Sequence, residues 1–520
     1  MTLLLWLCVA LGVLVHWLYR VNKDYCIRAF FARRVHTKSG KPLDTVVPMP
    51  QGQTIFANCF DLFGKDAAEV FHHLRQLSRK AAGESYLLYG LGFPNYNVID
   101  AHNAANILNH PYLITKSMIY NFLHPFLRTG VLTATEKKWH TRRSMLARTF
   151  HLDILSQFQE IFIAESLKFV RQFADQDECV VSLRDHIARF TLNSICETAM
   201  GIRLDEMAEK GDRYRENFHR IDEGFTKRLS NPLYWDDFVY KLFAERSYAS
   251  ALKAVHEFSS EIIAKRRVLL EEELEHRRAT QTADDDICAA RRKRFAMLDT
   301  LICAEKDGLI DNIGICEEVD TLMAEGYDTT SIGLVFALLN MSLYAEYQEQ
   351  CFKEIQEHIE DDLSNLNLSQ LNKLSHLNYF LKETMRLYPS LPIMGRQTIQ
   401  ETELDNGLIL PKGCQINIHV FDIHRNPKYW DSPEEFRPER FLPENCQKRH
   451  AYAYIPFSAG QRNCIGQKYA MQEMKTLLVV VLKQFKVLPV IDAKSIVFQV
   501  GITLRFKNKI KVKLVRRNRV

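Results

Sequence analysis

Several features that mark common protein classes are missing from this chain. None of its twelve cysteines pairs with another as C-x-x-C, which argues against a zinc ribbon or a thioredoxin-type site. Glycine and proline are scarce, at 21 and 16 of 520 residues, and no internal repeat is visible, so a collagen-like or low-complexity chain is excluded. With 47% hydrophobic residues, the chain can bury a large globular core.

Charge and cysteine usage indicate which partners and which cellular compartment to expect. A net charge of +5 is small beside 68 basic and 63 acidic side chains, so no nucleic-acid partner is expected. Gly90-x-Gly92 is followed by Asn95 where a dinucleotide fingerprint needs a third glycine. Cysteines spread this evenly in a chain this large are typical of reduced thiols on the cytosolic side of a membrane.

One long uncharged run stands near the start of the chain, over residues 2–19. Eighteen helical residues reach about 27 Å, enough for a thin bilayer. A cleaved signal peptide is the alternative, but the run has neither a basic leader nor a small-residue cleavage site. We therefore expect a single N-terminal transmembrane helix over residues 1–20, with the body of the protein on the cytosolic side of the endoplasmic-reticulum membrane. Aromatic and then basic residues follow in the order typical of a membrane exit: Trp17, Tyr19, Arg20, Lys23 and Arg28.

The rest of the chain divides into a short linker and one large domain. Residues 21–52 contain a proline-rich stretch that predicts a hinge, and residues 53–520 would form one large globular domain. Apolar spacing of three and four predicts mostly helix from about 103 to 390, and a hairpin is expected at 85–99. The expected fold class is mainly α with small β-sheets. Alternating lysines predict an edge strand near the C-terminus: Lys507, Lys509, Lys511 and Lys513.

The most specific pattern lies near the C-terminus, where ten residues hold five defined positions of the form F-x-x-G-x-R-x-C-x-G. A thiolate that binds iron would suit this setting, because glycines let the backbone pass close to a flat cofactor. The N-terminus of a helix expected from about residue 466 would stabilise the negative charge, and the arginine could reach a carboxylate of the cofactor. The plain alternative is a small apolar cysteine in a turn. The five positions are Phe457, Gly460, Arg462, Cys464 and Gly466.

This segment resembles the haem-binding loop of the cytochrome P-450 superfamily, the haem-thiolate monooxygenases. The resemblance implies the cytochrome P-450 fold and a haem b cofactor whose iron takes Cys464 as its axial ligand. It also implies cofactor contacts from Phe457 and Arg462 in the same loop, and from Trp139 and Arg143 in a W-x-x-x-R motif. An exposed basic helix face is the alternative interpretation of that second motif.

Two further motifs are similar to the family's and stand in its order. Residues 383–386 (ETMR) match the E-x-x-R helix, where a spacing of three places both charged side chains on one face. Residues 438–441 (PERF) follow before the cysteine loop. The resemblance implies that Glu383, Arg386 and Arg440 form a buried charge triad with a structural role.

Residues 318–330 (EVDTLMAEGYDTT) conflict with a plain helix. Gly326 costs about 1 kcal/mol relative to alanine, and acids interrupt apolar positions, a kind of conflict that often marks a functional site. Gly326 could open space for a ligand. The segment resembles the oxygen-activation helix of the family, which implies that Asp328 and Thr329 pass protons through water to dioxygen.

The same residues are most similar to the fourth family of these monooxygenases, which includes fatty-acid ω-hydroxylases and many insect enzymes. Glu325 stands where that family often esterifies a haem methyl group, so an ester-linked haem b is one expectation for the cofactor. Three residues depart from the family's pattern and leave the substrate open: Leu322, Ala324 and Tyr327.

The resemblance implies a membrane-anchored monooxygenase that hydroxylates a lipophilic substrate, which could be a fatty acid, a lipid hormone or a xenobiotic. Electrons from NADPH would come through a separate flavoprotein reductase, since no nucleotide-binding motif is visible, with cytochrome b5 as a second candidate donor. O2 and membrane lipid complete the expected partners. By analogy, substrate contacts would come from residues 113–128, 222–250, 390–396 and 498–503.

Two other functions stay open at this point. One is a thiolate-haem isomerase or dehydratase of oxidised lipids, and the other is a non-catalytic haem-binding sensor. Asp328 and Thr329 argue against both, because such proteins have no need of a proton relay.

Overall fold

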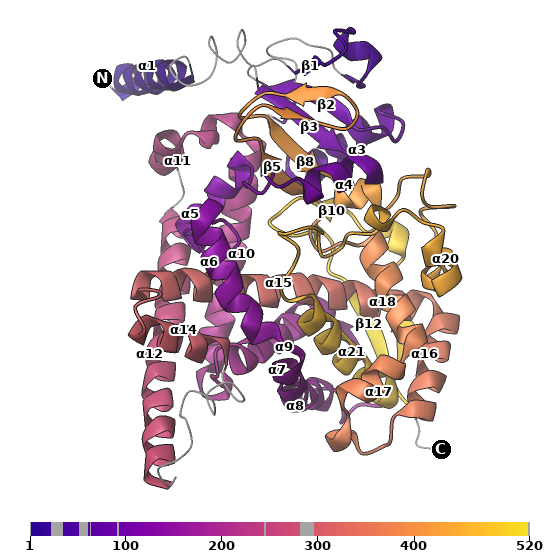
Figure 1. Ribbon diagram of the computed structural model, residues 1–520. Coiled ribbons are helices and arrows are strands. Elements are labelled where there is room, and N and C mark those ends of the chain that lie inside the picture. The colour runs from indigo at the N-terminus through magenta and orange to yellow at the C-terminus, as the bar shows by residue number, and fades with distance from the viewer. Residues whose placement is uncertain are drawn as a thin grey trace.

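The computed structural model describes residues 2–21, 35–50, 61–62, 64–90, 93–243, 246–280 and 296–517. Helices make up most of the described chain, and small sheets lie around them (Figure 1). The expected mainly α fold with small β-sheets is therefore confirmed.

Helix α15 (Asn312–Leu343) is the central element of the core. It begins after Asp311, whose carboxylate accepts a hydrogen bond from the Gly314 N–H as an N-cap. The helix packs against α9 (Leu183–Thr198), α18 (Ser375–Leu387) and α21 (Gln467–Gln484).

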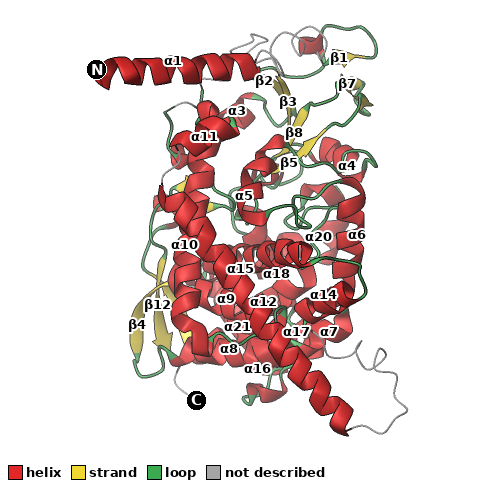
Figure 2. Ribbon diagram, turned by 90° about the vertical axis from the view of Figure 1, so that its left-hand side faces the viewer, coloured by secondary structure: helices red, strands yellow, loops and turns green. Residues whose placement is uncertain are grey.

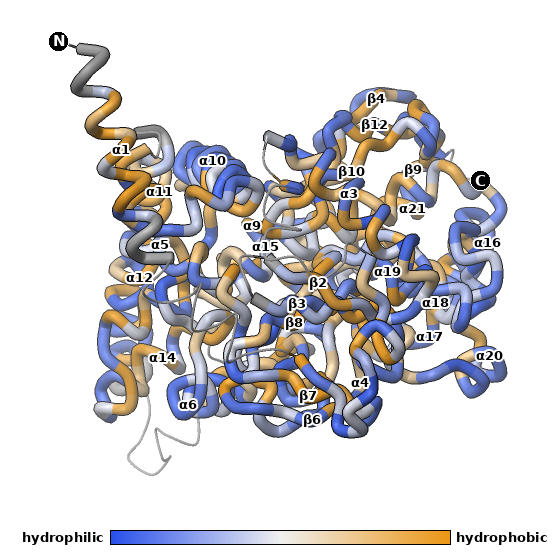
Figure 3. The backbone as a smooth tube through the Cα atoms, turned by 90° about the horizontal axis from the view of Figure 1, so that it is seen from above, coloured by the Kyte–Doolittle hydropathy of each residue, from blue (hydrophilic) through white to orange (hydrophobic). Residues whose placement is uncertain are grey.

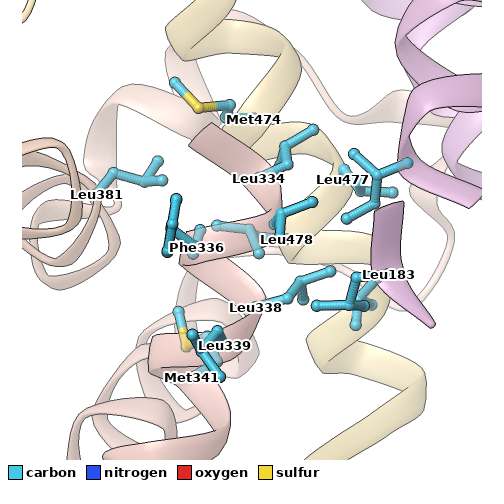
Figure 4. Close-up of a cluster of buried hydrophobic side chains, with 14 of the residues drawn as sticks. Leu183, Leu334, Phe336, Leu338, Leu339, Met341, Leu381, Met474, Leu477 and Leu478 are labelled. Atoms are coloured by element: carbon cyan, nitrogen blue, oxygen red, sulfur yellow. The ribbon is translucent and has the colours of Figure 1, made fainter. Parts of the chain in front are cut away.

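The C-terminal half of α15 is buried on every side, since each residue from 331 to 342 is shielded from solvent. Figure 4 shows its side chains facing those of α21, with Leu334 and Leu338 close to Leu477 and Leu478. Burying one such leucine contributes about 2 kcal/mol. This packing holds α15 and α21 together, and the cysteine loop leads directly into α21.

Further helices surround this core. They are α3 (Ala67–Lys80), α4 (Ala101–Asn109), α5 (His124–Leu127), α6 (Glu136–Ala147), α7 (Leu152–Gln157), α8 (Gln159–Arg171), α10 (Ala208–Ser230), α11 (Asp237–Phe243), α12 (Arg246–Thr280), α14 (Met297–Lys306), α16 (Ala345–His358), α17 (Leu368–Lys373), α19 (Val420–Ile423) and α20 (Pro443–Gln447). The expectation of mostly helix between about 103 and 390 is confirmed over the described residues.

A four-stranded sheet lies at one end of the molecule, in the order β2 (Tyr86–Gly90), β3 (Phe93–Val98), β8 (Gln415–Ile418) and β5 (Met394–Gln397). Strands β2 and β3 form the expected antiparallel hairpin. Strand β3 pairs with β8 in parallel, which joins segments more than 300 residues apart.

Three smaller sheets complete the β structure of the described chain. The first has the order β1 (His36–Thr37), β7 (Leu408–Leu410) and β6 (Thr402–Glu403), and the second joins β10 (Phe498–Gln499) to β11 (Arg505–Phe506). The third has the order β4 (Glu178–Ser182), β12 (Lys511–Arg516) and β9 (Phe485–Pro489). In Figure 2 this third sheet lies far from the four-stranded sheet.

The expected edge strand near the C-terminus is wrong. Strand β12 is the central strand of its sheet, with β4 on one side and β9 on the other. Val512 and Leu514 point into the core, while Lys511 is exposed and Lys513 lies 2.7 Å from Glu178 of β4. The lysine alternation therefore marks the solvent face of an interior strand.

The chain's first described helix is α1 (Thr2–Val21), which lies beside α11 in Figure 3. His16 of α1 lies 3.8 Å from Asp236, and its ring is 4.8 Å from that of Phe238. Among the helices that the structure describes, none combines the length and the apolar character needed to cross a bilayer, so the expected transmembrane helix is not confirmed. Residues 22–34 and 51–60, which hold parts of the expected linker and the start of the expected domain, lie outside the described residues.

Candidate active site

A cavity of about 450 Å³ lies against α15 and the cysteine loop. Its wall is mostly apolar, as suits a lipophilic ligand. All four segments expected to contact substrate contribute side chains to this wall, for example Ile119, Phe225, Ile393 and Ile502. The segments come from distant parts of the sequence, and the fold brings them to one place.

Cys464 lies in the wall of this cavity. Its side chain is exposed to the cavity. The Cys464 N–H donates to the Phe457 carbonyl at 2.8 Å, and α21 begins three residues later at Gln467, close to where a helix is expected. Burial and the nearby Glu325 raise the pKa of the thiol to about 11, against the opposing effect of the Gly466 N–H. A cation in contact with the sulfur would be needed to favour the thiolate.

The two glycines of the loop have different reasons to be glycine. Gly460 has a φ of +69°, and a Cβ there would lie 2.0 Å from the Leu108 carbonyl oxygen. A side chain at Gly466 would meet Cys464 Sγ only at 3.9 Å, which is ordinary contact. The positive φ and the close approach of the α4 backbone are therefore sufficient reason for a glycine at position 460.

Four cations gather near the loop: Lys116, Arg143, Arg396 and Arg462. Burial and the neighbouring Arg396 and Arg462 hold the pKa of Lys116 well below its usual value, although Glu325 attracts the ammonium. Burial and Arg396 likewise lower the pKa of Arg462 to about 9. Cations crowded in this way lack sufficient negative charge around them, and the two propionates of a haem would supply it. The residues present thus fit a haem.

The expected cofactor-contact residues lie close together in the wall of the cavity. Arg462 donates to the Ile114 carbonyl at 3.1 Å and to the carbonyl of Ala134, and its guanidinium lies 4.7 Å from the Trp139 ring. Arg143 donates to the backbone carbonyl of Asn463 at 2.9 Å and to its side chain at 2.6 Å. Phe457 also lines the cavity. These bonds join α6 to the cysteine loop and hold both arginines in position.

Helix α15 contributes Glu325, Asp328 and Thr329 to the same wall. Burial raises the pKa of Glu325 to about 7, even though Lys116 and Arg143 attract its carboxylate. The Thr329 hydroxyl donates to the Glu325 carbonyl at 2.6 Å. Asp328 accepts hydrogen bonds from Arg505 and Thr503. The fold therefore places the expected acid–alcohol pair and Cys464 around one cavity.

Gly326 lies in the wall of the cavity, and it also lies where α9 packs against α15. Helix α15 continues unbroken through this position. A Cβ on Gly326 would lie 2.7 Å from Ile195 Cδ1 and 2.8 Å from its Cγ1. The close approach of α9 is sufficient reason for a glycine here.

The three residues of the expected charge triad meet in the core. Arg386 donates to both carboxylate oxygens of Glu383, at 2.7 and 2.8 Å, and both side chains are fully buried. Arg440 Nε lies 3.4 Å from Glu383. Arg386 also donates to the His424, Pro433 and Glu435 carbonyls. This one guanidinium joins α18 to the segment 424–435, which precedes the cysteine loop in the chain.

The sequence motifs assign no individual role to several polar residues near the cavity, which are Lys116, Asp222, Arg396, Thr503 and Arg505. The first four lie inside segments expected to contact substrate, whereas Arg505 lies outside them. Two of them left a usable signal. Arg396 stands in the buried strand β5, and Arg505 stands between Leu504 and Phe506 in an apolar alternation. A charged residue on the inward face of a strand is costly unless it is paired, so such positions point to a partner or a ligand.

Comparisons with known proteins agree with this arrangement. A family model described as Cytochrome P450 matches residues 47–513. Probable cytochrome P450 4p2 of Drosophila melanogaster is 81% identical over 100% of this chain and 99% of its own length. Cytochrome P450 4p1 of the same species is 66% identical over 99% of this chain and 100% of its own, and probable cytochrome P450 4ac1 is 42% identical over 99% of both. The chain therefore belongs to the cytochrome P450 family, as a member similar to the type-4 proteins, and is a haem-thiolate monooxygenase.

Proposed function

We propose that this monooxygenase hydroxylates a lipophilic substrate, such as a fatty acid, a lipid hormone or a xenobiotic, with Cys464 as the axial ligand of the haem iron. The observation that carries the proposal is one mostly apolar cavity with Cys464, Asp328 and Thr329 in its wall. When bound there, a haem with a thiolate ligand would supply dioxygen activation. Arg143, Arg462, Lys116 and Arg396 would hold its propionates.

The chain's own part in the reaction is to hold the substrate and to move protons. Thr329 Oγ1 now donates to a carbonyl of its own helix, and a change of one χ1 rotamer would free that proton for the cavity. Asp328 would pass protons from water to the hydroxyl. A Thr329→Ala variant is expected to consume NADPH without forming product in proportion, and unchanged coupling would count against the relay.

The ligand assignment has a direct spectroscopic test. A Cys464→His variant keeps a ligand for iron but replaces the thiolate with a neutral imidazole. The reduced carbon-monoxide complex of the native protein should show the long-wavelength Soret band of thiolate ligation, and the variant should lose it. The same band in both proteins would contradict the assignment of Cys464. A Cys446→Ala variant, with a partly buried thiol outside the cavity wall, is the matched control.

The electron donor proposed is a separate NADPH-dependent flavoprotein reductase, with cytochrome b5 as a second donor. Support comes from the sequence, which carries no flavin or dinucleotide motif of its own. NADPH oxidation by the isolated chain should be absent and should appear when a microsomal reductase is added. Reduction of the isolated chain by NADPH alone would contradict the proposal.

Glu325 is the proposed attachment point for an ester-linked haem. Its carboxyl lies in the cavity wall near Lys116 and Arg143, two of the cations that would hold the haem edge. Some haem should stay with the protein after acid–organic extraction of native protein that has turned over, and none should stay with a Glu325→Gln variant. Complete release from both would remove the ester.

Attachment to the endoplasmic-reticulum membrane is proposed through the uncharged N-terminal segment. Its support is the run at 2–19 and the exposure of apolar side chains on α1, such as Trp6, Leu11 and Val15. The full chain should stay with membranes after carbonate extraction, and a chain without residues 1–20 should be released. Equal behaviour of the two would contradict this role for α1.

The mostly apolar wall of the cavity is compatible with each of the three substrate classes. A panel of medium- and long-chain fatty acids, lipid hormones and planar xenobiotics, incubated with reconstituted enzyme, would sort the candidates by product formed. Mass spectrometry would then locate the new hydroxyl group. An isomerised or dehydrated product without oxygen from O2 would favour the alternative chemistry.

A further inference from the structure

The segment from Val500 to Arg505 is bonded to the elements on both sides of the cavity. Its N-terminal part contacts α10, because Thr226 donates to the Val500 carbonyl at 3.3 Å and Asp222 accepts from the Ile502 N–H at 2.7 Å. The Leu504 N–H donates to the Ser390 carbonyl at 2.8 Å, and the Ser390 hydroxyl donates to the Thr329 carbonyl at 2.8 Å. Residues 500–503 themselves line the cavity, so a ligand there would touch this segment.

Arg505 stands at the end of this segment, between two carboxylates from different helices. Its two Nη atoms donate to the two oxygens of Asp328 on α15, at 2.9 and 3.0 Å. Its Nε donates to Asp222 on α10 at 2.7 Å. The Arg505 side chain is 8% exposed, and the two carboxylates raise its pKa. The guanidinium is therefore a permanent, buried charge shared by α10 and α15.

This arrangement leaves Asp328 little freedom. The Thr503 hydroxyl donates to Asp328 Oδ2 at 2.8 Å, so three donors already hold its two oxygens. A planar guanidinium fixes the plane of the carboxylate as well as its charge, which an ammonium cannot do. Asp328 is thus aimed by Arg505 and not by Thr329, its neighbour in the sequence.

We propose that Arg505 is a positioning residue for the proton relay. We further propose that Asp222 on α10, through its own hydrogen bond to Arg505, regulates how firmly Arg505 holds the Asp328 carboxylate. Because Asp222 holds Arg505 Nε and the Ile502 N–H, a shift of α10 toward or away from the cavity must move the guanidinium. Substrate that fills the cavity between α10 and residues 500–503 would thereby change how freely Asp328 exchanges a proton with water. The inference rests on the proposed role of Asp328 and Thr329 as the relay.

The first test removes the pair of hydrogen bonds that the two Nη atoms of Arg505 make to Asp328 and keeps the positive charge. Arg505→Lys retains a cation but cannot bond both Asp328 oxygens in one plane. The fraction of NADPH electrons recovered in product should fall about tenfold, with a larger kinetic solvent isotope effect and little change in KM. The matched control is Arg189→Lys, since Arg189 of α9 bonds both oxygens of Asp212 at 3.1 Å on the surface. Native coupling and an unchanged isotope effect in Arg505→Lys would overturn the proposal.

The second test separates positioning from stability. The trio Asp222, Arg505 and Asp328 carries a net charge of −1, and Arg505→Gln alone would leave two uncompensated buried carboxylates. The double variant D222N/R505Q returns the net charge to −1 without restoring the paired hydrogen bonds to Asp328. We expect its thermal midpoint to recover relative to the single variant while its coupling stays low. Recovery of coupling together with the midpoint would show that Arg505 only stabilises the fold.

A third experiment distinguishes failure of the positioning role of Arg505 from failure of the proton relay through Asp328 and Thr329. Asp328→Asn should uncouple the enzyme if Asp328 serves the relay at all. Uncoupling in Asp328→Asn together with native behaviour in Arg505→Lys would reject the role of Arg505 and leave the relay standing. Native coupling in both variants would reject the relay and the inference together. The thiolate-type Soret band must be present in each variant, so that loss of haem is not mistaken for loss of positioning.

Discussion

Replacing Gly326 by alanine separates two explanations for the glycine in the middle of α15. If the glycine serves only as an opening for a ligand, a methyl group facing the cavity should leave the stability of the fold unchanged or improved. If the glycine serves the packing of α9 against α15, the methyl group should clash with Ile195. The structure supports the second explanation, because the Cβ would lie 2.7 Å from Ile195 Cδ1.

The expected magnitude follows from two opposing contributions. Alanine in a helix interior is favoured over glycine by about 1 kcal/mol. Forcing a methyl group into a filled site costs about 1–3 kcal/mol, and three atoms of Ile195 lie within 3.5 Å of the new Cβ. The free energy of unfolding should therefore fall by about 1 kcal/mol, near the middle of these ranges.

The assay is a double-mutant cycle with Ile195→Ala, followed by chemical unfolding of the four proteins. Ile195 is buried, so Ile195→Ala alone should cost about 2–5 kcal/mol. In that background the nearest contacts of the new methyl group are gone, and Gly326→Ala should gain the helix preference of about 1 kcal/mol. The coupling energy between the two positions should then be about 2 kcal/mol.

A glycine without a close neighbour is the control. Gly211 lies in α10, and a Cβ there would meet nothing nearer than 3.6 Å. Gly211→Ala should therefore stabilise the protein by a few tenths to about 1 kcal/mol. Additive effects of Gly326→Ala and Ile195→Ala, together with stabilisation by Gly326→Ala in the native background, would refute the packing explanation.

Three further predictions test the core and its buried acids. Glu383→Gln should cost about 3–5 kcal/mol in chemical unfolding, because it leaves the fully buried charge of Arg386 uncompensated. Glu318 is buried in α15, and burial raises its pKa from 4.5 to about 7. Between these two pH values the folded state holds a proton that the unfolded state releases. The free energy of unfolding should therefore fall by about 3 kcal/mol between pH 4.5 and 7. Urea midpoints across this range should show a weaker fall in Glu318→Gln, and equal slopes would contradict the shift. Leu514→Ala should cost about 2–5 kcal/mol because its side chain is buried in the core. Lys511→Ala should cost under about 0.5 kcal/mol because Lys511 is exposed, and similar small effects of both would contradict the division of β12 into a buried and a solvent face.

Local patterns allowed the parts of the fold that depend on local interactions to be predicted. The antiparallel pair β2 and β3 falls within the hairpin expected at 85–99, and α21 begins at Gln467, close to the helix start expected at about residue 466. The sequence spacing of Glu383 and Arg386 places both on one helical face, and their bond needs no distant segment. In each case the partners lie within a few residues of one another.

Interactions between distant segments account for what could not be predicted. The lysine alternation of β12 correctly indicates one solvent face, but β4 lies more than 300 residues earlier in the chain and covers the strand's other edge. Likewise nothing near Gly326 indicates that Ile195 will pack on it. Residue type and spacing define what a segment can do, and the partner brought by the fold decides what it does.

The two carboxyl groups of α15 beside the cavity show how such partners divide one short motif into two chemical environments. Glu325 and Asp328 stand three residues apart on one helix, so their spacing alone gives no reason to expect different surroundings. The fold gives Asp328 a guanidinium and a hydroxyl within 3.0 Å, and these donors fix the orientation of its carboxylate. Among the described residues no cation is hydrogen-bonded to Glu325, and desolvation raises its pKa to about 7, which favours the neutral carboxyl group more than in water. A fixed carboxylate suits the aiming of protons, and a neutral carboxyl group beside the haem edge suits covalent attachment. Exchanging the two environments, by removing Arg505 or by adding a cation next to Glu325, should therefore impair two different functions.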